Sequence, residues 1–198
     1  KRQDNISRQG DGVIQAECII DPAITKPESF RIEKNADGKV TISAGDAGGL
    51  LYGKQEFSRL TAGGKSLPDG FRFEDAPDFE LRGTVLFLMK EGSYVYVLTP
   101  EEFPWFYDRE LLTHYFDYLQ ANRFNTIFIW TGHLFPSIVE MPEYPEAADL
   151  SKEDVLRNQE QFRWFTDECS KRNISVLLHF YNIMAVSYTH LRAHETKA

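Results

Sequence analysis

Residues suited to binding a polyhydroxylated ring lie at the ends of two apolar segments in the second half of the chain. Trp130 ends the segment 125–130 and His133 follows shortly after it, whereas His179 and Asn182 lie at or just past the end of the segment 174–180. An indole can stack on the apolar face of a sugar ring, and imidazole and amide groups can donate hydrogen bonds to hydroxyls. We therefore predict that Trp130, His133, His179 and Asn182 bind substrate. For Trp130 and His179 the alternative is an ordinary position in an apolar core.

The motifs of other common active sites are missing from the sequence. It contains no glycine-rich phosphate loop, no nucleophile elbow and no helical metal-ligand motif. Its two cysteines, Cys18 and Cys169, are far apart and outside any zinc-ligand spacing, which is typical of buried free thiols. We therefore expect no metal and no cofactor.

Charge and hydropathy exclude two classes of partner. The 198 residues include 22 Lys and Arg against 30 Asp and Glu, which gives a net charge of −8. A general electrostatic attraction to nucleic acid or to an anionic membrane surface is therefore not expected. No apolar segment approaches the roughly 20 residues that a membrane-spanning helix needs. We expect no nucleic-acid partner and no membrane span.

The first 65 residues have the pattern of a small α+β domain. Alternating segments at 30–33 and 40–43 flank the turn 35–38, which predicts a β-hairpin, and 12–20 is a further strand candidate. At 50–60 the residues Leu50, Phe57 and Leu60 fall on one face of a predicted helix. The stretch 66–78, rich in glycine and proline, then predicts a linker.

Strands and helices alternate in the segment 79–185. Apolar strands are predicted at 81–88, 125–130 and 174–180, as in a parallel sheet covered on both faces. Asp108 and Ser151 are predicted to cap the two intervening helices, and Asn173 to end the second. Short connections before each strand and long ones after it are typical of a (β/α)8 barrel, whose active site is built from the long loops. The alternative, a doubly wound sheet, would carry a phosphate-binding glycine turn after its first strand.

Four segments resemble glycoside hydrolases of family 20, in the same order along the chain. The segment 46–60 resembles a helix of the N-terminal domain that precedes the barrel in that family and in α-glucuronidases. The segment 79–83, which contains Arg82 and Gly83, resembles the start of the first barrel strand; 116–127 resembles the next helix and strand, and 142–145 a later turn. The resemblance spans most of 28–183 and implies an α/β fold. This fold would be a small α+β N-terminal domain followed by a truncated (β/α)8 TIM barrel containing its first three strands.

The resemblance also implies a β-N-acetylhexosaminidase-like enzyme that hydrolyses O-glycosyl bonds in an oligosaccharide or glycan. In family 20 the acetamido oxygen of the substrate attacks the anomeric carbon, assisted by an Asp–Glu pair at the end of the fourth barrel strand. The sequence stops after the third predicted strand. We therefore expect the catalytic residues beyond this chain, and we expect the chain alone to be inactive.

Several individual residues differ from the family 20 pattern or have a second explanation, so other functions than a β-N-acetylhexosaminidase stay open. The resemblance implies that Arg82 donates to sugar hydroxyls, and the alternative is a structural arginine at the start of its strand. Phe87 stands where family 20 has an Asp, and 130–136 lacks the His-x-x-x-Asp-Asp pattern of that family. The alternatives are therefore an α-glucuronidase-like exo-glycosidase and a non-catalytic carbohydrate-binding protein on the same scaffold. Bacteria that degrade glycans commonly export relatives with this architecture. The resemblance therefore implies a bacterial protein in the periplasm or outside the cell.

We interpret the C-terminal residues of the chain as not belonging to the natural protein. Residues 186–196 resemble a translated transposase-based sequencing adapter. We therefore expect a metagenomic fragment whose native sequence ends near Ala185, so that His190 and His194 are not candidate ligands. The expected organisation is an N-terminal α+β domain at 1–65, a linker at 66–78, a partial barrel domain at 79–185 and a non-native tail at 186–198.

Overall fold

The chain forms two compact units, Lys1–Leu81 and Arg82–Ala198. The structure, a computed structural model, describes residues 3–4, 15–89, 97–131, 135–140, 142–143, 145, 148 and 150–180. The adapter-like residues 186–198 lie outside this described part. No helix within it is long and apolar enough to cross a membrane.

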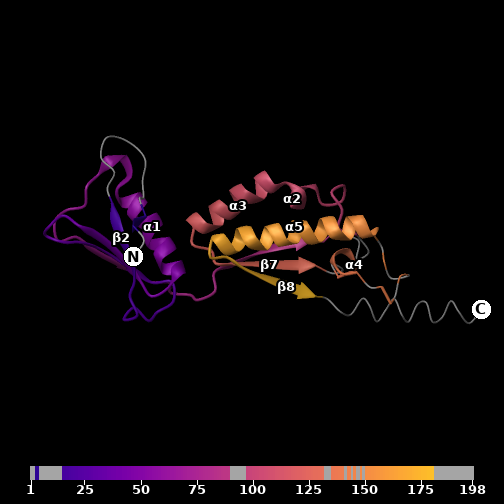
Figure 1. The fold of residues 1–198 in the computed structure, drawn as a ribbon, viewed down its shortest axis with the longest axis horizontal. Helices are drawn as coiled ribbons and strands as arrows, with labels where there is room; N and C mark the ends of the chain where they lie inside the picture. Colours follow the sequence, from indigo (N-terminus) through magenta and orange to yellow (C-terminus); the bar gives the residue numbers. More distant parts are fainter. Residues whose placement is uncertain are drawn as a thin grey trace, which may run out of the picture. The chain divides into compact units, whose positions relative to one another are not determined.

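The first unit is built on a five-stranded sheet (Figure 1). Its strands, in the spatial order β1-β2-β4-β3-β5, are β1 (Gln3–Asp4), β2 (Ala16–Ile20), β3 (Phe30–Lys34), β4 (Val40–Ala44) and β5 (Arg72–Asp75). The predicted hairpin is confirmed, because β3 and β4 pair antiparallel with Phe30 opposite Ala44. Gly38 in the connecting turn has a φ of 84°, a conformation that glycine adopts without steric cost. The predicted strand at 12–20 forms β2, which runs parallel to β4.

Helix α1 (Ala47–Leu60) packs on this sheet and is followed by the short 3-10 helix η1 (Ala62–Gly64). The predicted helix face is confirmed: Phe57 is fully buried, and the half-buried Leu50 and Leu60 pack against the same core. The buried face of this helix also contains Tyr52 and the glycines Gly48, Gly49 and Gly53. A Cβ atom added to Gly53 would lie 2.7 Å from the Ile42 side chain, so the missing side chain lets the helix approach β4 closely.

The first unit extends past the expected boundary at residue 65. Within the expected linker, β5 pairs antiparallel with β3, and Phe73 faces Ile32 in that register. Phe73 packs against the core of the unit, whereas Arg72 forms an ion pair with Glu33 at 3.1 Å on the other side of the sheet. This alternation is a strand pattern of only four residues, and the surrounding glycines and prolines obscure it in the sequence.

The second unit has the predicted order of strands and helices, which confirms the α/β class. Its strands β6 (Gly83–Leu88), β7 (Thr126–Thr131) and β8 (Ser175–Phe180) are parallel and lie in sequence order. Between β6 and β7 lie α2 (Pro104–Tyr107) and α3 (Arg109–Ala121); between β7 and β8 lie α4 (Phe135–Ile138) and α5 (Lys152–Lys171). In Figure 1 the long helices α3 and α5 lie on the same side of the strands.

The predicted caps of the two long helices are confirmed. The Asp108 side chain accepts a hydrogen bond from the backbone N–H of Leu111 at 2.9 Å, and the Ser151 hydroxyl accepts one from the N–H of Asp154 at 3.2 Å. Each bond satisfies a backbone donor that the first helical turn leaves without a partner.

Both long helices of the second unit also end in the same way. In α3 the N–H of Phe124 donates to the carbonyl five residues earlier, and in α5 the N–H of Ile174 does the same, both at 2.9 Å. Arg123 and Asn173, the residues just before these donors, have left-handed φ angles of 59° and 58°. This ending turns the chain back into β7 and β8 within a few residues, and it confirms the predicted end at Asn173.

Candidate functional site

Three rings form a row across the parallel strands of the second unit. Phe87 on β6, Trp130 on β7 and His179 on β8 are consecutive partners in the strand register, so they lie on the same face of the sheet. The ring centroids are 6.2 Å apart between Phe87 and Trp130 and 4.6 Å apart between Trp130 and His179. All three residues lie at or one position before the carboxyl end of their strands. We call Phe87, Trp130 and His179 the ring row.

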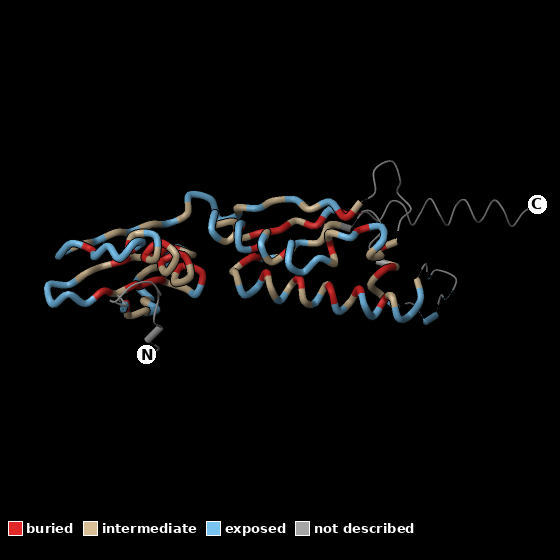
Figure 2. The backbone as a smooth tube through the Cα atoms, turned by 90° about the horizontal axis from the view of Figure 1, so that it is seen from above, coloured by how far each residue is buried: buried red, intermediate tan, exposed pale blue. Residues whose placement is uncertain are grey.

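The ring row lies on the face of the sheet that the helices do not cover. The opposite face carries Ile127 and Ile129, which are 0% exposed and pack with Phe116 of α3 and Phe165 of α5. Figure 2 shows the buried positions of α5 recurring along the helix. On the ring-row face, by contrast, Phe87 is 61% exposed and Trp130 37%. Next to the row, this face carries the exposed apolar side chains Val85 and Leu177.

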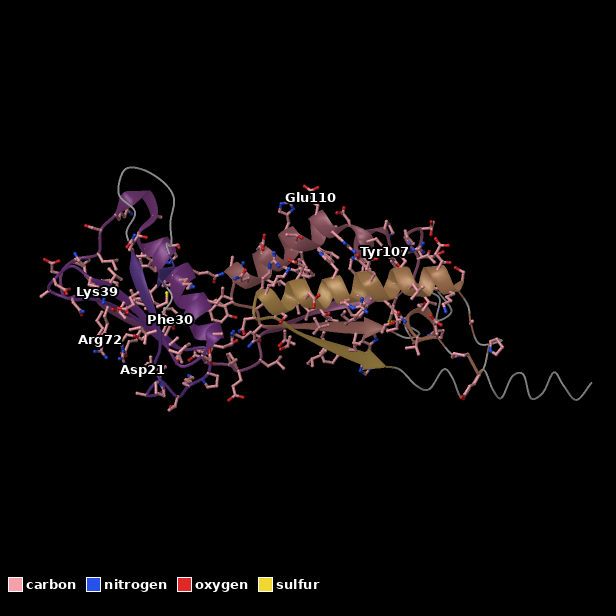
Figure 3. All side chains as sticks on the ribbon, in the orientation of Figure 1. Asp21, Phe30, Lys39, Arg72, Tyr107 and Glu110 are labelled. Carbon is pink, nitrogen blue, oxygen red and sulfur yellow. The ribbon has the colours of Figure 1, made fainter. Side chains whose placement is uncertain are left out.

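Two loops leave the carboxyl ends of β6 and β7, and α5 holds both of them. We define the first loop as 97–107 and the second loop as 135–140. Both loops contact Asn158 of α5, whose side chain is fully buried. Its amide nitrogen donates to the Leu98 carbonyl at 2.8 Å and to the Ser137 carbonyl at 2.9 Å, and its oxygen accepts from the Tyr107 hydroxyl. Figure 3 shows Tyr107 lying over α5.

Asn158 is not among the functional residues predicted from the sequence, although the sequence contains a signal for it. Asn158 and Gln161 fall on the same helical face as Val155 and Phe165, which is buried. A polar side chain within an apolar helical face is buried only when it has hydrogen-bond partners. The pattern therefore indicates a buried polar contact, but its partners lie far away in the sequence.

Burial also changes the acid–base behaviour of Tyr107. Desolvation raises the pKa of its hydroxyl to about 12 from the ordinary value of 10.0. An ordinary tyrosine is already protonated at neutral pH, and burial extends this protonated range to more alkaline pH, so the hydroxyl can keep donating to the Asn158 oxygen.

Arg82 lies at the opposite end of the strands from the ring row. It precedes β6, and its backbone N–H and carbonyl bond Asn125 at 2.9 Å each. Its side-chain Nε donates to the Arg123 carbonyl at 2.7 Å, in the connection between α3 and β7. About 16 Å of strand separates Arg82 from the level of Trp130, at roughly 3.3 Å per residue. This geometry favours the structural alternative for Arg82 over sugar binding.

The structure brings together two of the predicted substrate-binding residues. Trp130 and His179 are neighbours in the ring row, and Phe87 joins them although the sequence singled it out only as a departure from family 20. His133 and Asn182 lie outside the described residues. Of the predicted binding set, Trp130 and His179 are thus the members that the structure places together, with Arg82 at the other end of the strands.

The described strands of the second unit supply stacking surfaces and hydrogen-bond groups but no carboxylate. The sequences of β6, β7 and β8 contain neither Asp nor Glu. A pair of carboxyl groups is what most glycosidases use for proton transfer and nucleophilic attack. Within the described residues, no group of three or more His, Cys, Asp or Glu side chains is placed to hold a metal ion.

Comparisons with known proteins identify the fold. No protein-family model matches the chain, and no curated protein sequence does. Among solved structures, the chain is similar to an enzyme of glycoside hydrolase family 138 that targets pectin rhamnogalacturonan II, with 35% identity and a TM-score of 0.73 over 84% of this chain. It is also similar to a family 20 β-N-acetylglucosaminidase (19% identity, TM-score 0.53, 82% of this chain) and to a β-hexosaminidase from Streptomyces plicatus (14%, 0.51, 82%).

These neighbours define a glycoside hydrolase fold of the mixed α/β class. The family 20 structures share the architecture at low identity, so they support the fold alone. The chain spans 20% of the family 138 enzyme and about a third of the other two, 32% and 33%.

Proposed function

We propose that this chain is part of a glycoside hydrolase, comprising the N-terminal α+β domain and the first three strands of a (β/α)8 barrel. The ring row would then lie on the inner wall of the barrel, at the end where substrate binds. The observation that carries this proposal is the exposed apolar face with Trp130 and His179 at the carboxyl ends of parallel strands. The 35% identity to the family 138 enzyme supports it independently.

The topology favours a barrel over a doubly wound sheet. Strands β6, β7 and β8 follow one another in sequence order without reversal. Right-handed crossovers between parallel strands then place both connecting helices on the same face, as Figure 1 shows. In a doubly wound sheet the strand order reverses and helices cover both faces, whereas in a barrel the inner face is filled by apolar side chains. The exposed residues Val85, Phe87 and Leu177 fit the inner face of a barrel.

The ring row supports a role in holding a sugar next to the reacting bond. Trp130 offers an indole face for stacking against the C–H groups of a pyranose ring, and the His179 ring lies beside it. The carboxyl groups that cleave the glycosidic bond would come from later strands, because β6–β8 contain none. We therefore expect the chain alone to bind a glycan without hydrolysing it.

For the substrate we propose a pectic oligosaccharide, which rests on the family 138 neighbour. The second candidate is an N-acetylhexosamine-containing glycan, supported by the shared architecture with family 20. Phe87 weighs against this second candidate, because it replaces the family 20 Asp with an apolar ring inside the ring row. An α-glucuronidase-like enzyme and a non-catalytic binding protein are the remaining alternatives.

The test is an NMR titration of the 198-residue chain with ¹⁵N-labelled tryptophans. Rhamnogalacturonan II oligosaccharides should shift the indole signal of Trp130, and Trp130→Ala should weaken binding by about tenfold or more. The matched control is Tyr118→Ala, which removes a 63% exposed aromatic side chain from α3 and should leave affinity unchanged. Stronger binding of chito-oligosaccharides would favour the second candidate. Binding that is unaffected by Trp130→Ala, or no binding of either glycan, would contradict the proposed role of the ring row.

A further inference from the structure

The side-chain amide of Asn158 joins two segments that are far apart in the sequence. Its nitrogen donates one hydrogen bond to Leu98 in the first loop and one to Ser137 in the second. Its oxygen accepts the Tyr107 hydroxyl, which also belongs to the first loop. The residue is 0% exposed, so water cannot replace any of these contacts.

The two loops also contact each other directly at the same point. The backbone N–H of Leu98 donates to the Ser137 hydroxyl at 3.0 Å, and this bond is buried. The Tyr107 hydroxyl oxygen lies 3.1 Å from the Leu98 carbonyl oxygen. Asn158, Leu98, Ser137 and Tyr107 therefore form one buried polar cluster, which we call the loop clamp.

The neighbours of Asn158 on α5 each hold one loop only. The Gln159 side chain donates to the Ile138 carbonyl of the second loop at 2.9 Å. The Gln161 side chain donates to the Phe106 carbonyl of the first loop at 2.6 Å and accepts from Arg109. Among the side-chain contacts described for α5, only those of Asn158 reach both loops.

We propose that Asn158 is a positioning residue that couples the two loops, so that losing its amide releases both together. The loops follow β6 and β7, whose carboxyl ends carry Phe87 and Trp130. This inference goes beyond the proposed function, because it holds whichever ligand the ring row binds.

The experiment is amide hydrogen exchange on the full chain, comparing three substitutions on one helix. Asn158→Ala should accelerate exchange by about tenfold or more in both 97–107 and 135–140, while the amides of Ile127 and Ile129 keep their rates. Gln159→Ala should accelerate exchange in 135–140 only, and Gln161→Ala in 97–107 only. Arg163→Ala, at an exposed position of α5, should change neither loop.

Asn158→Asp provides a second variant if the alanine variant does not fold. It keeps the size of the side chain and the acceptor for Tyr107 but removes both donors, so both loops should again exchange faster. Coupling would be refuted if Asn158 variants accelerated one loop alone. It would also be refuted if they accelerated β7 as much as the loops, since that result would show only a general loss of stability.

Discussion

Trp130 and His179 lie directly opposite each other on the parallel strands β7 and β8, with ring centroids 4.6 Å apart and an angle of 34° between the ring planes. The pair is created by strand register, because the two residues occupy the same level of neighbouring strands. Both rings lie on the uncovered face of the sheet, where Trp130 is 37% exposed. A ligand approaching this face would meet the indole as a stacking surface.

The two faces of this sheet should respond differently to the same kind of substitution. Phe87→Thr removes an aromatic side chain that is 61% exposed, and we expect it to lower the free energy of unfolding by less than about 0.5 kcal/mol. Ile129→Thr places a hydroxyl in the fully buried core between sheet and helices, and we expect a loss of about 2–4 kcal/mol. Urea unfolding followed by tryptophan fluorescence measures both, because Trp105, Trp130 and Trp164 all belong to the second unit.

A large loss of stability for Phe87→Thr would contradict the description of its face as uncovered. Ile127→Thr is a matched replicate of the buried change and should behave as Ile129→Thr does. Leu177→Thr is the matched replicate of the exposed change on β8.

Arg82 should affect stability and leave sugar binding unchanged. Arg82→Lys loses the Nε donor to the Arg123 carbonyl, and we expect about 1 kcal/mol less free energy of unfolding. The affinity for an oligosaccharide should stay within about twofold of that of the unchanged chain, because Arg82 lies roughly 16 Å from the level of the ring row. Fluorescence-detected unfolding and the NMR titration give the two quantities. A weaker affinity at unchanged stability would restore Arg82 to the binding site.

The parts of the fold that the sequence predicted are those specified by local patterns. The apolar segments ending in Trp130 and containing His179 mark β7 and β8, and the caps Asp108 and Ser151 mark the starts of helices within the same few residues. The order of these elements then indicates a parallel sheet. Because parallel strands place their carboxyl ends together, the sequence also indicated that Trp130 and His179 share one edge.

The parts that the sequence did not predict depend on contacts between distant residues. The loop clamp joins Asn158 to Leu98 across 60 positions, and no local pattern encodes that distance. Strand β5 is recognised through its pairing with β3, and the close approach of α1 to β4 depends on the missing side chain of Gly53. The catalytic carboxyl groups of a glycosidase are likewise assembled from several strands, and the described strands β6–β8 supply none.

Asp46 should be a strong local determinant of the first unit. One oxygen of its carboxylate accepts from the N–H of Gly49 at 2.7 Å, which caps α1, and the other accepts from the N–H of Glu28 at 2.8 Å. Asp46→Ala removes both bonds, and we expect about 2 kcal/mol less stability of this unit. Because no tryptophan lies in the first unit, exchange of the α1 amides is the appropriate measurement.

Two variants test whether the Asp46 effect comes from both of its oxygens. Asp46→Asn retains one acceptor and should lie between the unchanged chain and Asp46→Ala. Asp37→Ala removes a single exposed bond to the N–H of Lys39 at 3.1 Å, and its effect should be below about 0.5 kcal/mol. Equal effects of Asp46→Ala and Asp46→Asn would show that a single remaining acceptor contributes nothing, which would contradict separate contributions from the two oxygens.

Cys169 should make the second unit less stable as the pH rises above about 9. Burial raises the pKa of its thiol to about 12 from the ordinary value of 9.0. Below that ordinary value the thiol is protonated in both the folded and the unfolded chain, so it contributes no pH dependence. Between these two pKa values the unfolded chain loses the proton while the folded chain keeps it, so stability falls with a slope approaching about 1.4 kcal/mol per pH unit.

Cys169→Ala isolates this contribution. At pH 7 the variant should be less stable by about 1–2 kcal/mol, because it leaves a small cavity in the core of the second unit. Above pH 9 the difference from the unchanged chain should shrink, since the alanine variant lacks the titrating thiol. Urea unfolding with fluorescence detection at pH 7, 9 and 10.5, under reducing conditions, measures the difference. Ser170→Ala, at an exposed position of the same helix, should follow the unchanged chain at every pH. A difference that stays constant with pH would show that burial does not hold this thiol protonated.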